Sequence, residues 1–166
     1  FLFCLFAGTR RDEALNLMGG DCDFKNKIIY IRGTKTEGSN RRLPMFPILE
    51  KILCAANAGK NEKVFKIGKH RADADFKIFR GTESCAVLHW LRHTFGTVKI
   101  CVESIPANTV ALWMGHSDAA TTTNIYTHPE DLAPDIYYSG KHSETEKTAI
   151  LQARYNEIIS LAGDLL

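Results

Sequence analysis

The sequence predicts an α+β fold that is predominantly helical, with a small antiparallel β-sheet or hairpin at one edge. Apolar residues recur at three- and four-residue spacing through much of the chain, which is the period of an amphipathic helix. Residues 27–32 are instead rich in β-branched and aromatic side chains, and residues 41–45 are their expected partner across a polar loop. With 166 residues, 45% of them apolar, the chain is long enough for one ordinary core.

The first elements are set by glycines and capping residues. Residues 1–7 form an apolar helical run that Gly8 should end. The segment Thr9-Arg-Arg-Asp12 resembles a capping box, so a second helix should start there and run to Gly19-Gly20. The hairpin follows, and its connecting loop contains Lys35.

The middle of the chain gives a weaker pattern. Residues 47–56 predict a helix that begins with proline, and residues 57–63 predict a turn. The charged stretch 66–83 gives no assignment. Residues 87–99 predict an amphipathic helix that carries its apolar residues on one face. Its two histidines and an arginine should leave the core side together.

Three elements are expected after that helix. Residues 108–114 should form a helix that ends at Gly115-His116, and Ser117 or Asp118 should cap a following helix that carries Tyr126. Ser143-Glu-Thr-Glu146 is a second capping box. It should open an amphipathic terminal helix, whose apolar stripe is Leu151, Tyr155, Ile158, Ala162 and Leu165.

Charge is divided unevenly along the chain. The net charge is only +2, but residues 1–100 hold 18 Lys and Arg against 10 Asp and Glu, whereas residues 101–166 hold 3 against 9. Such a split predicts a basic surface for a polyanion and an acidic segment elsewhere in the chain. The five cysteines are scattered without a C-x-x-C spacing, which favours a reducing cytoplasm over a disulfide framework. The apolar start is expected to be neither a signal peptide nor a membrane span.

Four boxes occur in a fixed order along residues 1–129. The first is Ala7-Gly-Thr-Arg-Arg-Asp-Glu-Ala-Leu15, and the second is Thr34-Lys-Thr36 with Arg-Arg-Leu-Pro44 after it. The third is Leu88-His-Trp-Leu-Arg-His-Thr-Phe95, and the fourth is Met114-Gly-His-Ser-Asp118 followed by Thr121-Thr-Thr-Asn-Ile-Tyr-Thr-His128. Together they resemble the arginine, lysine, H-x-L-R-H-T-F and L-G-H-S…Y-T-H boxes of the tyrosine recombinases, or phage integrases. The ten-residue interval from His116 to Tyr126 resembles the mobile-element members, the integrases of conjugative transposons and phages of Gram-positive bacteria.

The resemblance implies a site for attack on a phosphodiester. Its six catalytic positions fall on Arg10, Lys35, His89, Arg92, His116 and Tyr126. Guanidiniums suit the charge of the transition state, an imidazole can take the tyrosine proton, and a lysine can protonate the leaving oxygen. Supporting roles are implied for Glu13, which orients the site, and for His93.

The resemblance also implies the partners and the division of the chain. We expect no metal and no cofactor. His89 and His93 have the spacing of two metal ligands on a helix, but Trp90 stands where a zinc-protease helix has Glu, so a hydrogen-bonding role is favoured for His93. We expect double-stranded DNA as substrate and a tetrameric assembly of protomers on it. Residues 1–129 should be a catalytic core whose start is truncated, 130–142 a linker, and 143–166 a tail helix that docks on a neighbouring protomer. A DNA-binding domain is expected upstream of this chain.

Two other functions stay open at this point. A type IB topoisomerase uses related chemistry but relaxes supercoils without exchanging strands between duplexes, and the fourth box favours a recombinase. A catalytically silent DNA-binding relic would keep the fold without the reaction.

Overall fold

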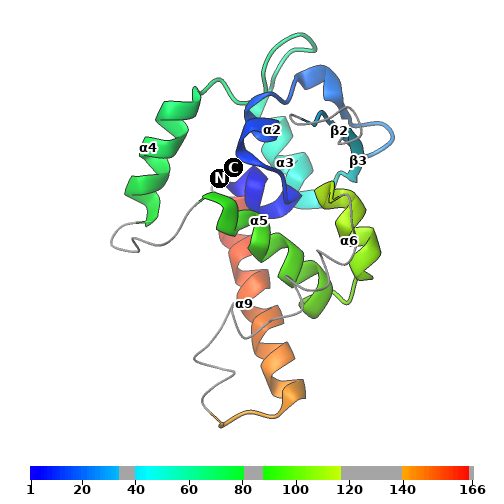
Figure 1. Ribbon diagram of the computed structural model, residues 1–166, viewed down its shortest axis with the longest axis vertical. Coiled ribbons are helices and arrows are strands. Elements are labelled where there is room, and N and C mark those ends of the chain that lie inside the picture. The colour runs from blue at the N-terminus through cyan, green and yellow to red at the C-terminus, as the bar shows by residue number, and fades with distance from the viewer. Residues whose placement is uncertain (34–39, 81–87, 117–139, 165–166) are drawn as a thin grey trace.

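The computed structural model describes residues 1–33, 40–80, 88–116 and 140–164, without the side chains of residues 79 and 80. The fold is mostly helical with a small sheet at one edge, as the sequence predicts (Figure 1). Within the described residues no helix is both long and apolar enough to cross a membrane. The expected helix that carries Tyr126 and most of the expected linker lie outside these residues.

Two short helices open the chain. The first, α1 (Leu2–Ala7), ends at Gly8, whose φ of 61° is left-handed and favours glycine. The second, α2 (Arg11–Leu15), is shorter than predicted and is capped one residue later, because the backbone N–H of Arg10 donates to Glu13 Oε2 at 2.8 Å. The prediction of Thr9 as the cap was therefore wrong: Thr9 is buried, and its hydroxyl donates to Cys4 Sγ at 3.8 Å.

The predicted hairpin is confirmed and gains a third strand. A 3₁₀ turn, η1 (Gly19–Asp21), leads into β1 (Cys22–Asp23), and the antiparallel order is β1, β2 (Ile28–Ile31), β3 (Arg41–Pro44). Ile29 pairs with Leu43 and both are buried, because alternate residues of a strand share one face. The same alternation places Arg41 on the inner face and Arg42 on the outer face.

Five further helical segments of the described residues lie between the sheet and the terminal helix of the chain. They are α3 (Pro47–Ala56), α4 (Lys69–Arg80), α5 (Leu88–Thr97), the π-helical η3 (Val98–Val102) and α6 (Ala107–Met114). The α4 helix lies in the stretch that the sequence left unassigned, and Figure 1 shows it at the side of the molecule. Arg11 Nη1 binds Asp73 at 2.6 and 2.8 Å, so an ion pair joins α2 to this helix.

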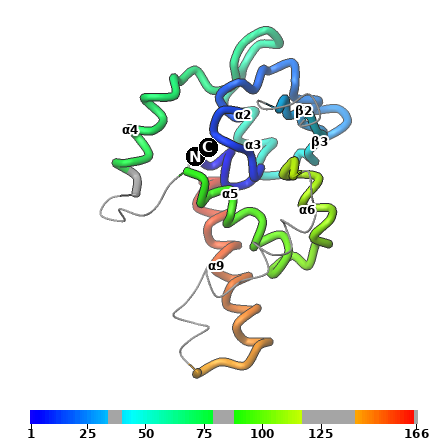
Figure 2. Tube along the Cα trace, viewed as in Figure 1, coloured from blue at the N-terminus to red at the C-terminus, as the bar shows by residue number. Residues whose placement is uncertain are grey.

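One core holds these elements together. Figure 2 shows the N-terminal segment at the centre of the molecule, where α1 contacts both α3 and α5. Buried side chains of α1, the sheet, α3 and α6 meet in one cluster, among them Phe6, Ile29, Leu43, Leu49 and Met114. Each such side chain contributes about 1.5–3 kcal/mol to folding. The core thus fixes the strand and helix ends on which the polar residues stand.

The terminal helix α9 (Glu144–Asp164) packs against its own chain. Its capping box is confirmed, since the Ser143 N–H and hydroxyl both donate to Glu146 Oε2 at 2.8 Å. The Tyr155 ring lies 6.3 Å from that of Phe6. Ile158 departs from the predicted stripe, because 43% of it is exposed. Docking of the tail on a neighbouring protomer stays a prediction.

Candidate active site

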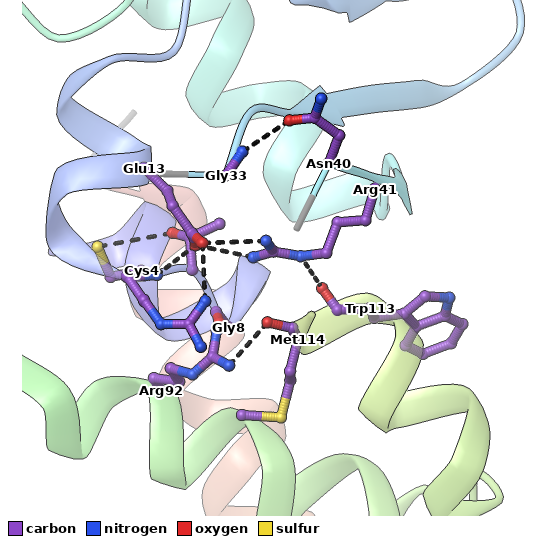
Figure 3. A network of polar contacts seen from close by, with 11 residues as sticks. Cys4, Gly8, Glu13, Gly33, Asn40, Arg41, Arg92, Trp113 and Met114 are labelled. Carbon is purple, nitrogen blue, oxygen red and sulfur yellow. Dashed lines mark hydrogen bonds and ion pairs between the residues drawn. The ribbon is translucent and has the colours of Figure 1, made fainter. Parts of the chain in front are cut away.

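A buried carboxylate joins two arginines at the start of α2 (Figure 3). The Glu13 side chain has no exposed surface, and its Oε1 accepts from Arg10 Nη1 at 2.9 Å. Arg41 donates to both carboxylate oxygens, at 3.0 and 2.8 Å. Burial alone raises the pKa of Glu13, but the hydrogen bonds and charge of Arg41 and the bonds from Arg10 outweigh it, so this pKa is lowered. Glu13 is therefore an anion that orients Arg10.

Arg92 lies in the core, where the sequence did not place it. It is 1% exposed, although the helical pattern predicted that it would leave the core side with the histidines. Its Nη1 donates to the Gly8 carbonyl at 2.6 Å and its Nη2 to the Met114 carbonyl at 2.7 Å. The prediction was wrong because the carbonyls that end α1 and α6 offer this guanidinium two acceptors inside the fold. Arg92 thus holds the ends of two helices together.

His116 lies just after α6, among positive charges. Gly115 ends the helix with a φ of 69°, and the His116 N–H donates to the Ala111 carbonyl at 3.0 Å. Burial, followed by the charges of Arg92, Arg10, Arg41 and His89, lowers the pKa of His116 to about 4. These charges come from separate segments of the chain, so the fold brings Arg10, His89, Arg92 and His116 to one place. At neutral pH the imidazole of His116 is uncharged.

The two histidines of α5 stand on one face of the helix. Their ring centroids are 4.8 Å apart and the rings meet edge to face. The pKa of His89 is lowered by burial and by the charges of His93, Arg92 and Arg10. The pKa of His93 is lowered by burial and by the charge of Arg92. The lowered pKa keeps the imidazole of His89 uncharged at neutral pH, which is the form that can accept a proton.

No cluster that could hold a metal ion occurs within 1–33, 40–80, 88–116 and 140–164. The expectations of no metal and no cofactor stay predictions.

Lys35 and Tyr126 lie outside the described residues. The residues that flank the Lys35 loop are described, and the Gly33 N–H donates to Asn40 Oδ1 at 2.9 Å, which joins the two ends of the loop. The next residue is Arg41, which binds the same carboxylate as Arg10. The base of the hairpin therefore lies beside the arginine and histidine cluster.

Arg41 belongs to this cluster, although the sequence did not predict a role for it. A signal for it exists: Arg41 and Leu43 alternate onto the inner face of a strand, and an arginine there needs a hydrogen-bonding partner. The identity of that partner, 28 residues earlier in the chain, is not visible in the pattern.

Comparison with known proteins gives consistent matches. Residues 1–132 match the phage integrase family. The chain is 33% identical over 142 residues to the prophage integrase IntF of Escherichia coli K12, covering 77% of this chain and 30% of that protein. The crystal structure of the XerA recombinase superposes with a TM-score of 0.62 at 25% identity, covering 85% of this chain and 56% of that one.

A third match is a DNA complex. The XerH site-specific recombinase, bound to its palindromic difH substrate in a post-cleavage complex, superposes with a TM-score of 0.54 at 26% identity. The match covers 79% of this chain and 43% of that one. The chain thus spans between about a third and just over half of the length of these relatives.

Proposed function

The chain belongs to the phage integrase family, the tyrosine recombinases, and from this premise we propose that it carries the catalytic site of a site-specific DNA recombinase. The reaction is integration or excision of DNA by cleavage and rejoining of strands through a 3′-phosphotyrosine. The observation that carries the proposal is that hydrogen bonds join Arg10, through Glu13 and Arg41, and Arg92 to the end of α6, just before His116. The charges of Arg10, Arg92 and His89 also act on His116. Cytoplasmic location belongs to the same proposal.

Arg10 and Arg92 supply the positive charge that phosphate requires. A transition state at phosphorus spreads negative charge over the nonbridging oxygens, and guanidiniums stay protonated at any physiological pH. The Arg10 side chain is 30% exposed, so it can reach a bound strand while Glu13 orients it. Arg92 adds its charge from the base of the site, because two backbone carbonyls hold it there.

Tyr126 is the nucleophile in this proposal. Its phenol oxygen bonds to phosphorus, the bond from phosphorus to the 5′-oxygen breaks, and the phenol proton passes to the uncharged His89. The 5′-oxygen takes a proton from Lys35, which leaves a free 5′-hydroxyl and a 3′-phosphotyrosine. The covalent bond keeps the energy of the phosphodiester, so rejoining to another strand needs no external energy source.

Double-stranded DNA and further protomers are the proposed partners. Exchange between two duplexes needs four strand cleavages, and each protomer of this proposal offers one Tyr126. The working unit is therefore a tetramer on DNA. The XerH complex supports the DNA part, because that relative is bound to its substrate. The type IB topoisomerase alternative is not favoured, because the matched relatives are integrases and recombinases.

Covalent capture tests the nucleophile. The full product of the gene is incubated with nicked duplexes that span the junctions of the element that carries the gene, so that cleavage releases a short fragment and cannot reverse. Wild-type protein should give an adduct that survives denaturation, and Tyr126→Phe should give none. The matched control is Tyr30→Phe, an exposed tyrosine of β2, which should form the adduct at the wild-type rate. An adduct with Tyr126→Phe refutes the nucleophile, and no adduct with wild type favours the silent relic.

A bridging sulfur tests the general acid. Lys35→Ala should slow cleavage of ordinary DNA but not of DNA whose 5′-bridging oxygen is replaced by sulfur, because a thiolate leaves without protonation. If sulfur does not restore the rate, Lys35 is not the general acid.

A further inference from the structure

Arg41 is a buried arginine that joins three elements. Its side chain is 6% exposed and starts from the first residue of β3. Besides its two bonds to Glu13 of α2, its Nε donates to the Trp113 carbonyl of α6 at 2.6 Å. Figure 3 shows the guanidinium between the carboxylate and the end of α6.

The place where Arg41 meets α6 is the turn that leads to His116. A Cβ on Gly115 would lie 2.9 Å from Arg41 Nη1, so the guanidinium packs directly on the backbone of this turn. Arg41 therefore contacts, on one side, the carboxylate that orients Arg10 and, on the other, the residues just before His116.

We propose that Arg41 is a positioning residue for the recombinase reaction, which fixes the Arg10 and Glu13 pair at a set distance from His116. The proposal rests on the proposed function. Arg41 is assigned a positioning role because its Nε, Nη1 and Nη2 all donate to Glu13 or to the Trp113 carbonyl.

Arg41 also changes the net charge around the Glu13 carboxylate. One carboxylate paired with one arginine is neutral, whereas Glu13 paired with both Arg10 and Arg41 leaves one positive charge. Arg41 occupies both carboxylate oxygens in a forked arrangement that lysine cannot copy. The positive charge of Arg10 thus stays available to a phosphate, and the geometry depends on the fork as well as on the charge.

The test compares Arg41→Met and Arg41→Lys with Arg42→Met in the full protein. Arg42 is the matched control, because it is the next residue of β3 and is exposed, with its guanidinium carbon 5.9 Å from the centre of the Tyr30 ring. Adduct formation is timed at saturating concentrations of the nicked junction duplex. Arg41→Met should slow it by about tenfold or more, since misplacement of a catalytic group by about 1 Å costs up to roughly a hundredfold. Arg42→Met should stay within about twofold of wild type.

A second measurement separates positioning from a merely structural role. The imidazole signals of His116 are titrated by NMR in the same proteins. The groups that face His116 are Arg10, Arg41, Arg92 and His89, so loss of the Arg41 charge should raise the pKa of His116. Arg41→Lys keeps the charge, so it should leave this pKa low while cleavage is still slow. Should Arg41→Met fail to fold, Arg41→Lys carries the rate test.

The outcomes are distinct. The proposal is overturned if the Arg41 variants cleave as fast as wild type, or if Arg42→Met loses as much rate as they do. If wild type forms no adduct, only the proposed function is refuted. The titration still tests whether Arg41 acts on His116. An unchanged His116 pKa in folded Arg41→Met then overturns the inference, and a raised pKa supports it.

Discussion

Replacing Gly8 with alanine should destabilise the fold and disturb the Arg92 site together. Gly8 ends α1 with a φ of 61°, and its carbonyl accepts the 2.6 Å bond from Arg92 Nη1. A Cβ at this position would lie 2.3 Å from Cδ1 of the Phe95 ring. Phe95 is 2% exposed and stands one turn after Arg92 on α5, so it has little room to move away.

The magnitude follows from two separate costs. An alanine in the left-handed region costs about 1–2 kcal/mol. Overpacking of a dense core adds about 1–3 kcal/mol. The free energy of unfolding should therefore fall by about 2–5 kcal/mol, which in a chain of this size lowers the Tm by roughly 5–15 °C.

Urea denaturation of Gly8→Ala and Gly140→Ala separates the backbone cost from the overpacking cost. Gly140 is the matched control, because its φ is 67° and a Cβ there would meet nothing within 4 Å. Gly140→Ala should lose only the backbone cost of about 1–2 kcal/mol. Equal losses in the two variants would show that Phe95 does not block the Cβ, and the packing argument would fail.

Three further predictions concern charge and packing. Glu13→Gln should lower the free energy of unfolding by about 3–5 kcal/mol, because two arginines lose a buried anion; a loss below about 1 kcal/mol in urea would contradict the network. His116 should titrate by NMR with a pKa of about 4. The pKa of histidine in the unfolded chain is near 6.5. Between pH 4 and 6.5 the folded state therefore binds fewer protons at His116 than the unfolded state does. The contribution of His116 to the free energy of unfolding is thus present above about pH 6.5 and is lost as the pH falls toward 4. His116→Gln should flatten that slope, and an unchanged slope would assign it to other groups. Tyr155→Ala should cost about 3 kcal/mol, because its ring packs on Phe6; Ile158→Ala, at an exposed position of the same helix, should stay within about 0.5 kcal/mol. Equal losses would mean that α9 does not pack through Tyr155.

Local elements were predictable because short-range chemistry fixes them. Pro47 at the first helical position and the left-handed Asn57 bound α3 at the predicted residues. The hairpin was predicted from its β-branched and aromatic residues and its polar loop, and Ile29 and Leu43 pair on its inner face. The start of α2 was predicted one residue too early. Its capping carboxylate is Glu13 and not Asp12, and the sequence does not distinguish these two acidic residues.

The sequence by itself determined the family and the order of the four boxes, because residue types at fixed spacing carry that information without coordinates. It could not determine which groups meet across the fold. Arg92 binds the Gly8 carbonyl 84 residues away, and Arg41 binds Glu13 and the Trp113 carbonyl 28 and 72 residues away. A charged side chain that is buried away from water must have a hydrogen-bonding or oppositely charged partner, and that partner can come from any part of the chain. Only the tertiary structure therefore decided that Arg92 lies inside and that Arg41 shares the carboxylate of Arg10.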